Sequence, residues 1–139
     1  MALAKLNLLH LLRKLYDRVH FALSVYEETV VEGVRLGYED AGTLRSFLDQ
    51  MGWHPQKVES ANMPAGLREI HLDRGEQDTL ALAISLNSRL VLMDETAGRQ
   101  LAREQGLAVR GSLGVLIEAY QRDLISPDQL RLYLSLIHI

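Results

Sequence analysis

A strand-like segment over residues 89–93, apolar at every position after Arg89, lies between two segments of helical periodicity, and this arrangement limits the possible folds most strongly. The preceding segment, residues 78–87, is apolar on almost every side, which predicts a buried helix. A strand that is apolar at every position is typical of a parallel sheet covered on both faces. A helix over 95–105 and a second strand over 107–109 are expected next. Such strand–helix alternation predicts an α/β fold with a parallel sheet.

Helices are also predicted in the N-terminal half. The opening segment, residues 1–16, has leucines at helical spacing and is predicted to form one amphipathic helix. Ser24 and Glu27 have the spacing of a capping box, which predicts a helix that begins at Ser24 and stops near Gly33. Another helix is expected over residues 40–51, and the glycine that follows is expected to end it.

The composition excludes several classes of protein. A chain of 139 residues has the length of one domain. Its net charge of −3 excludes an overall basic surface of the kind that dominates non-specific DNA binding. The chain has 0 cysteines, which excludes disulfides, Cys-zinc sites and thiol nucleophiles and fits a reducing compartment, so we expect a cytoplasmic protein. No apolar run approaches the roughly 18 residues needed to span a bilayer, so no membrane partner is expected.

Several chemistries lack their sequence motifs. The chain has no P-loop and no nucleophile-elbow motif, and Gly111 and Gly114 alone are too few for a dinucleotide-binding fingerprint. The 5 histidines show no spacing typical of metal ligands. Acidic residues near the ends of predicted elements therefore remain as the candidates for chemistry.

Two aspartates stand at informative positions. Asp94 closes the predicted strand, and ligands of parallel sheets bind beyond the carboxyl ends of strands. The alternative is that Asp94 only caps the next helix. Asp78 lies on a helix stripe shared with small and apolar residues, a poor place for an unpaired charge. Glu76 is explained by reciprocal capping with Asp73, so Asp78 is the preferred site residue of the two.

A glutamate completes the candidate set. Glu28 shares a helix stripe with Val25 and Val31, although a solvated helix face is the alternative explanation. If Glu28, Asp78 and Asp94 meet at one sheet edge, their carboxylates repel each other unless a cation neutralises them. Hard oxygen ligands favour Mg²⁺ or Mn²⁺. Such a site suits phosphodiester hydrolysis, in which the metal activates water and stabilises charge on the phosphate.

Four segments of the chain resemble the PIN-domain family. They cover residues 24–28, 72–83, 90–95 and 111–116, and within the family they are most similar to small prokaryotic members related to VapC-type toxins. The resemblance extends over one PIN-like domain, residues 1–133. It implies a three-layer α/β/α sandwich with a central parallel sheet.

The resemblance also implies an activity. It implies a Mg²⁺- or Mn²⁺-dependent endoribonuclease with an RNA substrate, often restrained by a small antitoxin protein and often a homodimer. By this resemblance, Glu28, Asp78 and Asp94 match the second, third and fourth acids of the family, and Glu95 is expected to be an auxiliary metal ligand. Three arginines are candidates for contacts with RNA phosphates, although solvated arginines on helices are the commoner case: Arg99, Arg103 and Arg110.

Both ends of the chain depart from the family pattern. The family begins with a strand that ends in an aspartate, whereas Met1 is followed at once by a helix-like sequence, so that strand and its acid are expected to be missing. This loss would remove one metal ligand and leave buried sheet groups unpaired, each costing roughly 1–3 kcal/mol, and an inactive copy is the alternative that it leaves open. The last six residues, 134–139, match the translation of a transposon-end adapter and are expected to be a non-native tail.

Two other functions are open alternatives. One is a non-catalytic PIN-like module that binds nucleic acid or an antitoxin, which the missing first acid favours. The other is a phosphorylation receiver, because residues 91–94 are similar to the acceptor strand of that family. Against the receiver, the chain lacks an early acidic pair, a Met-Pro loop after the strand and a late Lys-Pro.

Overall fold

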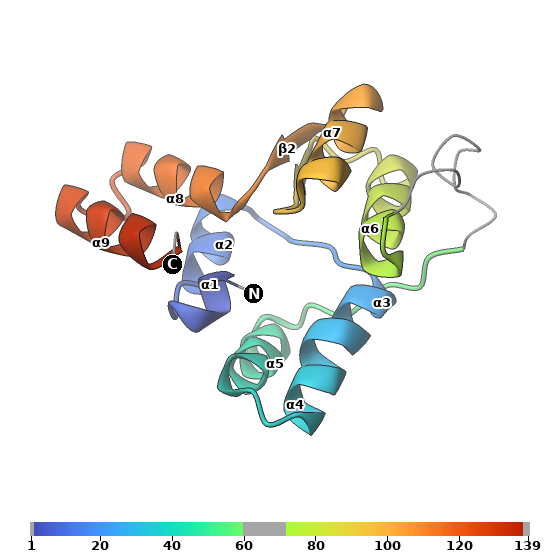
Figure 1. Cartoon of the computed structure of the whole chain (residues 1–139), viewed down its shortest axis with the longest axis horizontal. Helices are drawn as coiled ribbons and strands as arrows, with labels where there is room; N and C mark the ends of the chain where they lie inside the picture. The colour runs from blue at the N-terminus through green and yellow to red at the C-terminus, as the bar shows by residue number, and fades with distance from the viewer. Residues whose placement is uncertain (1, 60–71, 138–139) are drawn as a thin grey trace.

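Helices make up most of the computed structural model, which describes residues 2–59 and 72–137 (Figure 1). They are α1 (Ala2–Lys5), α2 (His10–Leu15), α3 (Leu23–Tyr26), the π-helical turn η1 (Glu27–Val31), α4 (Glu32–Arg35), α5 (Glu39–Met51), α6 (Arg74–Ser85), α7 (Thr96–Glu104), α8 (Ser112–Gln121) and α9 (Pro127–Ile137). In Figure 1, α8 and α9 lie side by side, and α4 and α5 form a second helical hairpin.

A small parallel sheet lies between these helices. Its strands are β1 (Leu90–Leu92) and β2 (Ala108–Arg110), paired in parallel with Val91 opposite Val109. α7 connects the two strands, while α6 packs against β1 and α8 against β2. The predicted α/β class with a parallel sheet is confirmed, and the sheet has two strands in the part of the chain that the structure describes.

The core has two parts. The larger cluster joins α1, α2, α5 and α8, with Leu11 and Leu116 fully buried at its centre. The smaller cluster joins α6, β1 and α7 through Leu80, Val91 and Ala102. The predicted burial of the helix over 78–87 is confirmed for most of its apolar residues.

The prediction of one opening helix is wrong. The chain forms α1 and α2 instead, and Asn7 between them has a φ of 58°. Asparagine tolerates this left-handed conformation better than most residues, which permits the break. The N–H of Leu8 donates to the carbonyl of Leu3 at 2.7 Å and closes the turn. Leu12 and Leu15 are still buried, so the spacing identified the buried side correctly.

The predicted capping box at Ser24 is also wrong. α3 begins one residue earlier, after Ala22, and no side chain caps it. The N–H of Leu23 instead donates to the carbonyl of Gln56 at 2.8 Å, next to a parallel bridge between Ala22 and Gln56. A carbonyl that is distant in the sequence therefore accepts a hydrogen bond from a backbone N–H at the start of the helix. Ser24 lies inside the helix with its side chain buried.

The helix ends near Gly33, as predicted, since it continues through α4 only to Arg35. Gly33 itself lies inside the helix and is a packing position. A Cβ at Gly33 would lie 2.5 Å from Cβ of Ala41, so only glycine allows α4 and α5 to approach this closely. The turn that follows is made by Gly37, whose φ is 80°. The predicted end of α5 is correct, because Gly52 has a φ of 67°.

The C-terminal segment forms α9. Ser126 and Gln129 cap its start reciprocally: the N–H of Gln129 donates to Oγ of Ser126 at 3.1 Å, and the N–H of Ser126 donates to Oε1 of Gln129 at 2.8 Å. Leu134 continues the helix and packs against the larger core cluster. The expectation of a non-native tail over 134–139 stays a prediction, and its last two residues lie outside the described residues.

Candidate active site

Glu28 lies in η1, where the helix widens to a π-turn. Such turns inside α-helices are frequent at functional sites, because the extra residue changes where side chains point. The carboxylate of Glu28 reaches the first turn of α6. A Cβ at Gly75 would lie 3.1 Å from Oε2 of Glu28, so the absence of a side chain at Gly75 makes room for this carboxylate.

Asp78 lies one turn further along α6 and is held from two sides. Its side chain is only 14% exposed. Oγ of Ser24 donates a 2.6 Å hydrogen bond to Oδ2 of Asp78, and Nε of Arg74 lies 3.7 Å from the same oxygen. These two partners stabilise the charge that the sequence analysis expected to be unfavourable if unpaired. One of them, Ser24, was predicted to cap its own helix instead.

The acids of this region influence one another. Partial burial and the nearby carboxylates of Asp73 and Asp78 raise the pKa of Glu28. Asp73 also accepts a 2.8 Å hydrogen bond from the N–H of Glu76, which confirms the predicted cap of α6. The sequence argument treated Asp73 only as a cap and missed its proximity to Glu28. The negative charges of Asp73 and Asp78 therefore act on Glu28, and these three residues are called here the acid cluster.

A second group of acids lies at the same turn of α6. Partial burial and the carboxylates of Asp73 and Glu95 raise the pKa of Glu76. Because Glu95 follows β1, its influence on Glu76 indicates that the carboxyl end of the strand lies near the first turn of α6. Asp73 acts on both Glu28 and Glu76, and it links the acid cluster to the end of the sheet.

Asp94, the residue before Glu95, is engaged by the start of α8. The N–H of Ser112 donates to Oδ1 of Asp94 at 2.7 Å, and Oγ of Ser112 donates to Oδ2 at 2.8 Å. The alternative that Asp94 caps the next helix, α7, is wrong, because the residue at that cap is Glu95 and no side chain caps α7. Asp94 stabilises the helix after that one, across 18 positions of sequence.

A family model described as a PIN domain matches residues 1–138. The chain belongs to the PIN-domain family. This confirms the resemblance seen in the sequence and assigns the chain a nuclease-type fold. Neither the search of curated proteins nor the search of solved structures found a match.

The carboxylates of this PIN domain suit a divalent metal by their chemistry. Carboxylate oxygens are the ligands that Mg²⁺ and Mn²⁺ prefer. Burial and the neighbouring charges of Asp73 and Asp78 raise the pKa of Glu28, and a bound cation would offset the part that comes from these charges. Within residues 2–59 and 72–137, however, no three His, Cys, Asp or Glu side chains are gathered as a metal-binding group. The structure associates Glu28 with Asp78, and it holds Asp94 separately on Ser112.

The arginines proposed for RNA contacts differ in their surroundings. Arg99 extends toward the end of β1, since its Nη1 lies 3.2 Å from the position of a Cβ on Gly111, next to Asp94. Its Nε is buried and, among the described residues, has no hydrogen-bond partner. Arg110 is ion-paired with Glu118, which also accepts a 3.0 Å hydrogen bond from the hydroxyl of Tyr16. Arg103 is exposed near the C-terminal end of α7.

The PIN domain shows no membrane segment in its described part, where every helix is too short or too polar to cross a bilayer.

Proposed function

We propose that this PIN domain is a divalent-metal-dependent endoribonuclease in which Glu28 and Asp78 provide the central carboxylates. The observation that carries the proposal is the approach of Glu28 to the first turn of α6, where its Oε2 lies 3.1 Å from the position of a Cβ on Gly75, one turn before Asp78. Carboxylates brought together in this way repel one another when they are charged, and a bound cation relieves the repulsion. Membership of a nuclease-type family supports a phosphodiester as the substrate.

The residues around the cluster have distinct tasks in this proposal. Ser24 orients Asp78 through its 2.6 Å hydrogen bond, and the glycine at position 75 leaves room for Glu28. Mg²⁺ or Mn²⁺, when bound, supplies positive charge that activates water and stabilises the transition state. Asp94 and Glu95 provide further carboxylates at the end of β1. In this proposal a phosphate is contacted by Arg99, which extends toward Asp94 and has a buried Nε without a partner among the described residues.

Cleavage of single-stranded RNA tests this proposal. We expect the full chain to cleave RNA in Mg²⁺ or Mn²⁺ and to stop in a chelator. Asp78→Asn and Glu28→Gln should each lower the rate by at least about 100-fold, the range typical for loss of a catalytic carboxylate. Asp128→Asn is the matched control, because the Asp128 side chain is 93% exposed on α9. Cleavage that survives the chelator, or that survives both substitutions, would contradict the proposal.

A non-catalytic binding module is the second candidate function. The observation that favours it is the engagement of both carboxylate oxygens of Asp94 by Ser112. This function predicts RNA binding without cleavage under any metal condition. The same cleavage experiment, combined with RNA binding measured by fluorescence anisotropy, separates the two candidates.

A further inference from the structure

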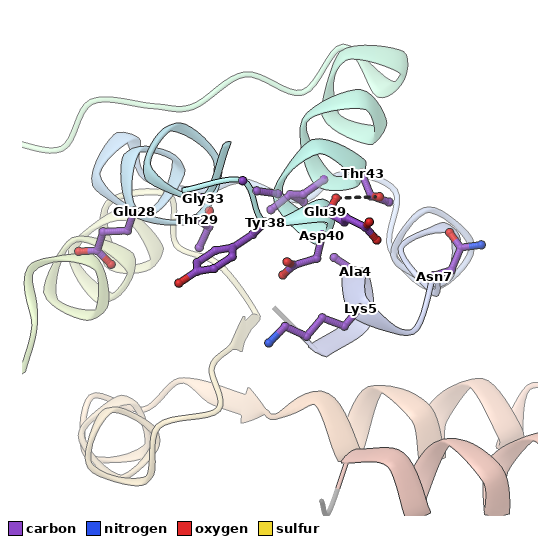
Figure 2. Close-up of a pocket in the computed structure, with 13 residues that line it drawn as sticks. Ala4, Lys5, Asn7, Glu28, Thr29, Gly33, Tyr38, Glu39, Asp40 and Thr43 are labelled. Atoms are coloured by element: carbon purple, nitrogen blue, oxygen red, sulfur yellow. Dashed lines mark hydrogen bonds between the residues drawn. The ribbon is translucent and has the colours of Figure 1, made fainter. Parts of the chain in front are cut away.

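A groove of about 790 Å³ leads away from Glu28. Its walls come from α1, from the turn after α4 and from the start of α5. Figure 2 shows the ring of Tyr38 between Glu28 and Thr29 on one side and Asp40 and Lys5 on the other. A volume of this size accommodates a small ligand such as a nucleotide.

The backbone of the turn that carries Tyr38 is fixed. The N–H of Tyr38 donates to the carbonyl of Gly33 at 2.9 Å, and the N–H of Gly37 donates to that of Val34 at 3.0 Å. The contact of Gly33 with Ala41 holds α4 against α5 below this turn. The ring of Tyr38 therefore projects from a rigid base.

The side chain of Tyr38 is left open to solvent. It is 60% exposed, and in the part of the chain that the structure describes it has neither an aromatic nor a hydrogen-bonding partner. Single exposed aromatic residues are common and need no explanation by themselves. Here the exposed ring lines the same groove as a carboxylate of the acid cluster, and nucleobases stack on rings of this kind.

We infer that this groove holds a nucleotide of single-stranded RNA next to the cleaved phosphodiester, with its base stacked on Tyr38. The inference rests on the proposed nuclease function and names its substrate-positioning residue. Lys5 is the basic residue among those that line the groove, so its ammonium attracts phosphate, while the carboxylates of Glu28 and Glu39 repel it. The base lies on the Tyr38 ring, and the sugar–phosphate backbone passes Lys5. A base paired in a duplex does not expose its face, so single strands are the expected substrate.

Binding of a fluorescent RNA to the full chain, measured by anisotropy without divalent metal, tests the inference. The probe is a single-stranded RNA of about ten nucleotides, a length suited to one binding site, and a second probe of equal length lacks its bases. Tyr38→Ala should weaken binding of the base-bearing RNA about tenfold, as expected for one lost stacking contact, and Tyr38→Phe should restore it. Leu36→Ala is the matched control, because Leu36 is 54% exposed and lies outside the groove.

The probe without bases identifies stacking directly. It should bind the wild-type chain about tenfold more weakly than the base-bearing RNA does, and this difference should vanish in Tyr38→Ala. Equal binding by wild type and Tyr38→Ala, an equal loss for both probes, or no RNA binding by the wild-type chain would overturn the inference. Base-dependent binding through Tyr38 without cleavage in Mn²⁺ would support base stacking in the groove and contradict the proposed nuclease activity. Normal cleavage with an unchanged KM in Tyr38→Ala would contradict base stacking in the groove and leave the proposed nuclease activity intact.

Discussion

Ser24 and Asp78, which are 54 positions apart in the sequence, are joined by a 2.6 Å hydrogen bond from the serine hydroxyl to Oδ2 of the aspartate. The bond connects α3 to α6 and fixes the direction of the Asp78 carboxylate. Because Ser24 is buried and the acceptor is charged, its loss leaves a partly buried carboxylate without a main donor.

Ser24→Ala should therefore destabilise the fold by about 2 kcal/mol, the usual range for hydrogen bonds to a charged group. Urea unfolding followed by circular dichroism measures this change. Ser85→Ala is the matched control on α6, since among the described residues the Ser85 hydroxyl bonds only to the carbonyl of Leu82 in its own helix. An equal loss of unfolding free energy in both variants would show that the Ser24–Asp78 hydrogen bond stabilises the fold no more than a hydrogen bond within one helix does.

Glu28→Gln should increase stability at neutral pH. Burial and the nearby carboxylates raise the pKa of Glu28 above its ordinary value of 4.5, so the folded state holds this proton more tightly than the unfolded state does. The free energy of unfolding of the wild-type chain therefore falls as pH rises above 4.5 and Glu28 loses its proton, and Glu28→Gln removes this loss. The gain in Tm should be near zero at the acidic end and reach a few degrees at most near neutral pH, because Glu28 is largely exposed.

The control for this pH series is Glu27→Gln, which changes the exposed neighbour of Glu28 in the same helix turn. The pH-dependent gain in Tm should be larger for Glu28→Gln than for Glu27→Gln. If Glu28→Gln gives a pH-independent difference from wild type, the repulsion of Glu28 by its neighbours is absent in solution.

Two substitutions of Asp94 should distinguish a structural role of this residue from a catalytic one. Asp94→Ala removes both acceptors of Ser112 at the start of α8 and should cost about 1–2 kcal/mol of stability, as for other helix caps. Asp94→Asn keeps an acceptor for the N–H of Ser112 and should stay near wild-type stability, yet it should abolish cleavage. Thermal unfolding and the RNA cleavage rate are the two measurements. Full activity in a stable Asp94→Asn protein would show that Asp94 acts only as a cap.

Two glycines should respond in opposite directions to alanine. Gly33→Ala introduces a methyl group 2.5 Å from Cβ of Ala41 and should destabilise the fold by about 1–3 kcal/mol, as overpacking does. Gly42→Ala, in the interior of α5, meets no atom within 4 Å and should stabilise the fold by about 0.5–1 kcal/mol. Chemical unfolding of both variants checks this pair. The reverse order would contradict the close approach of α4 and α5.

The sequence predicted best those features that depend on neighbouring residues. The cap of α6 by Asp73 and the end of α5 at Gly52 were both correct, because each depends on residues within one helical turn. The parallel pairing of β1 with β2 was also correct, since an apolar strand between helices has few other environments.

The errors involve partners that are distant in the sequence. The pattern at Ser24 resembled a local cap, but the carbonyl of Gln56 satisfies the helix start and leaves the serine free to reach Asp78. The partner of Asp94 is likewise Ser112, beyond the whole of α7. Local patterns identify which groups need partners, and the tertiary fold decides which partners they obtain.

Binding of Mn²⁺ to the full chain, measured by isothermal titration calorimetry at neutral pH, tests the central claim most directly. Wild type and Asp128→Asn should bind one Mn²⁺ with the same affinity, whereas the double variant Glu28→Gln/Asp78→Asn should show no binding. Unchanged binding in the double variant, or no binding in the wild-type chain, would contradict the assignment of Glu28 and Asp78 as the metal-binding carboxylates.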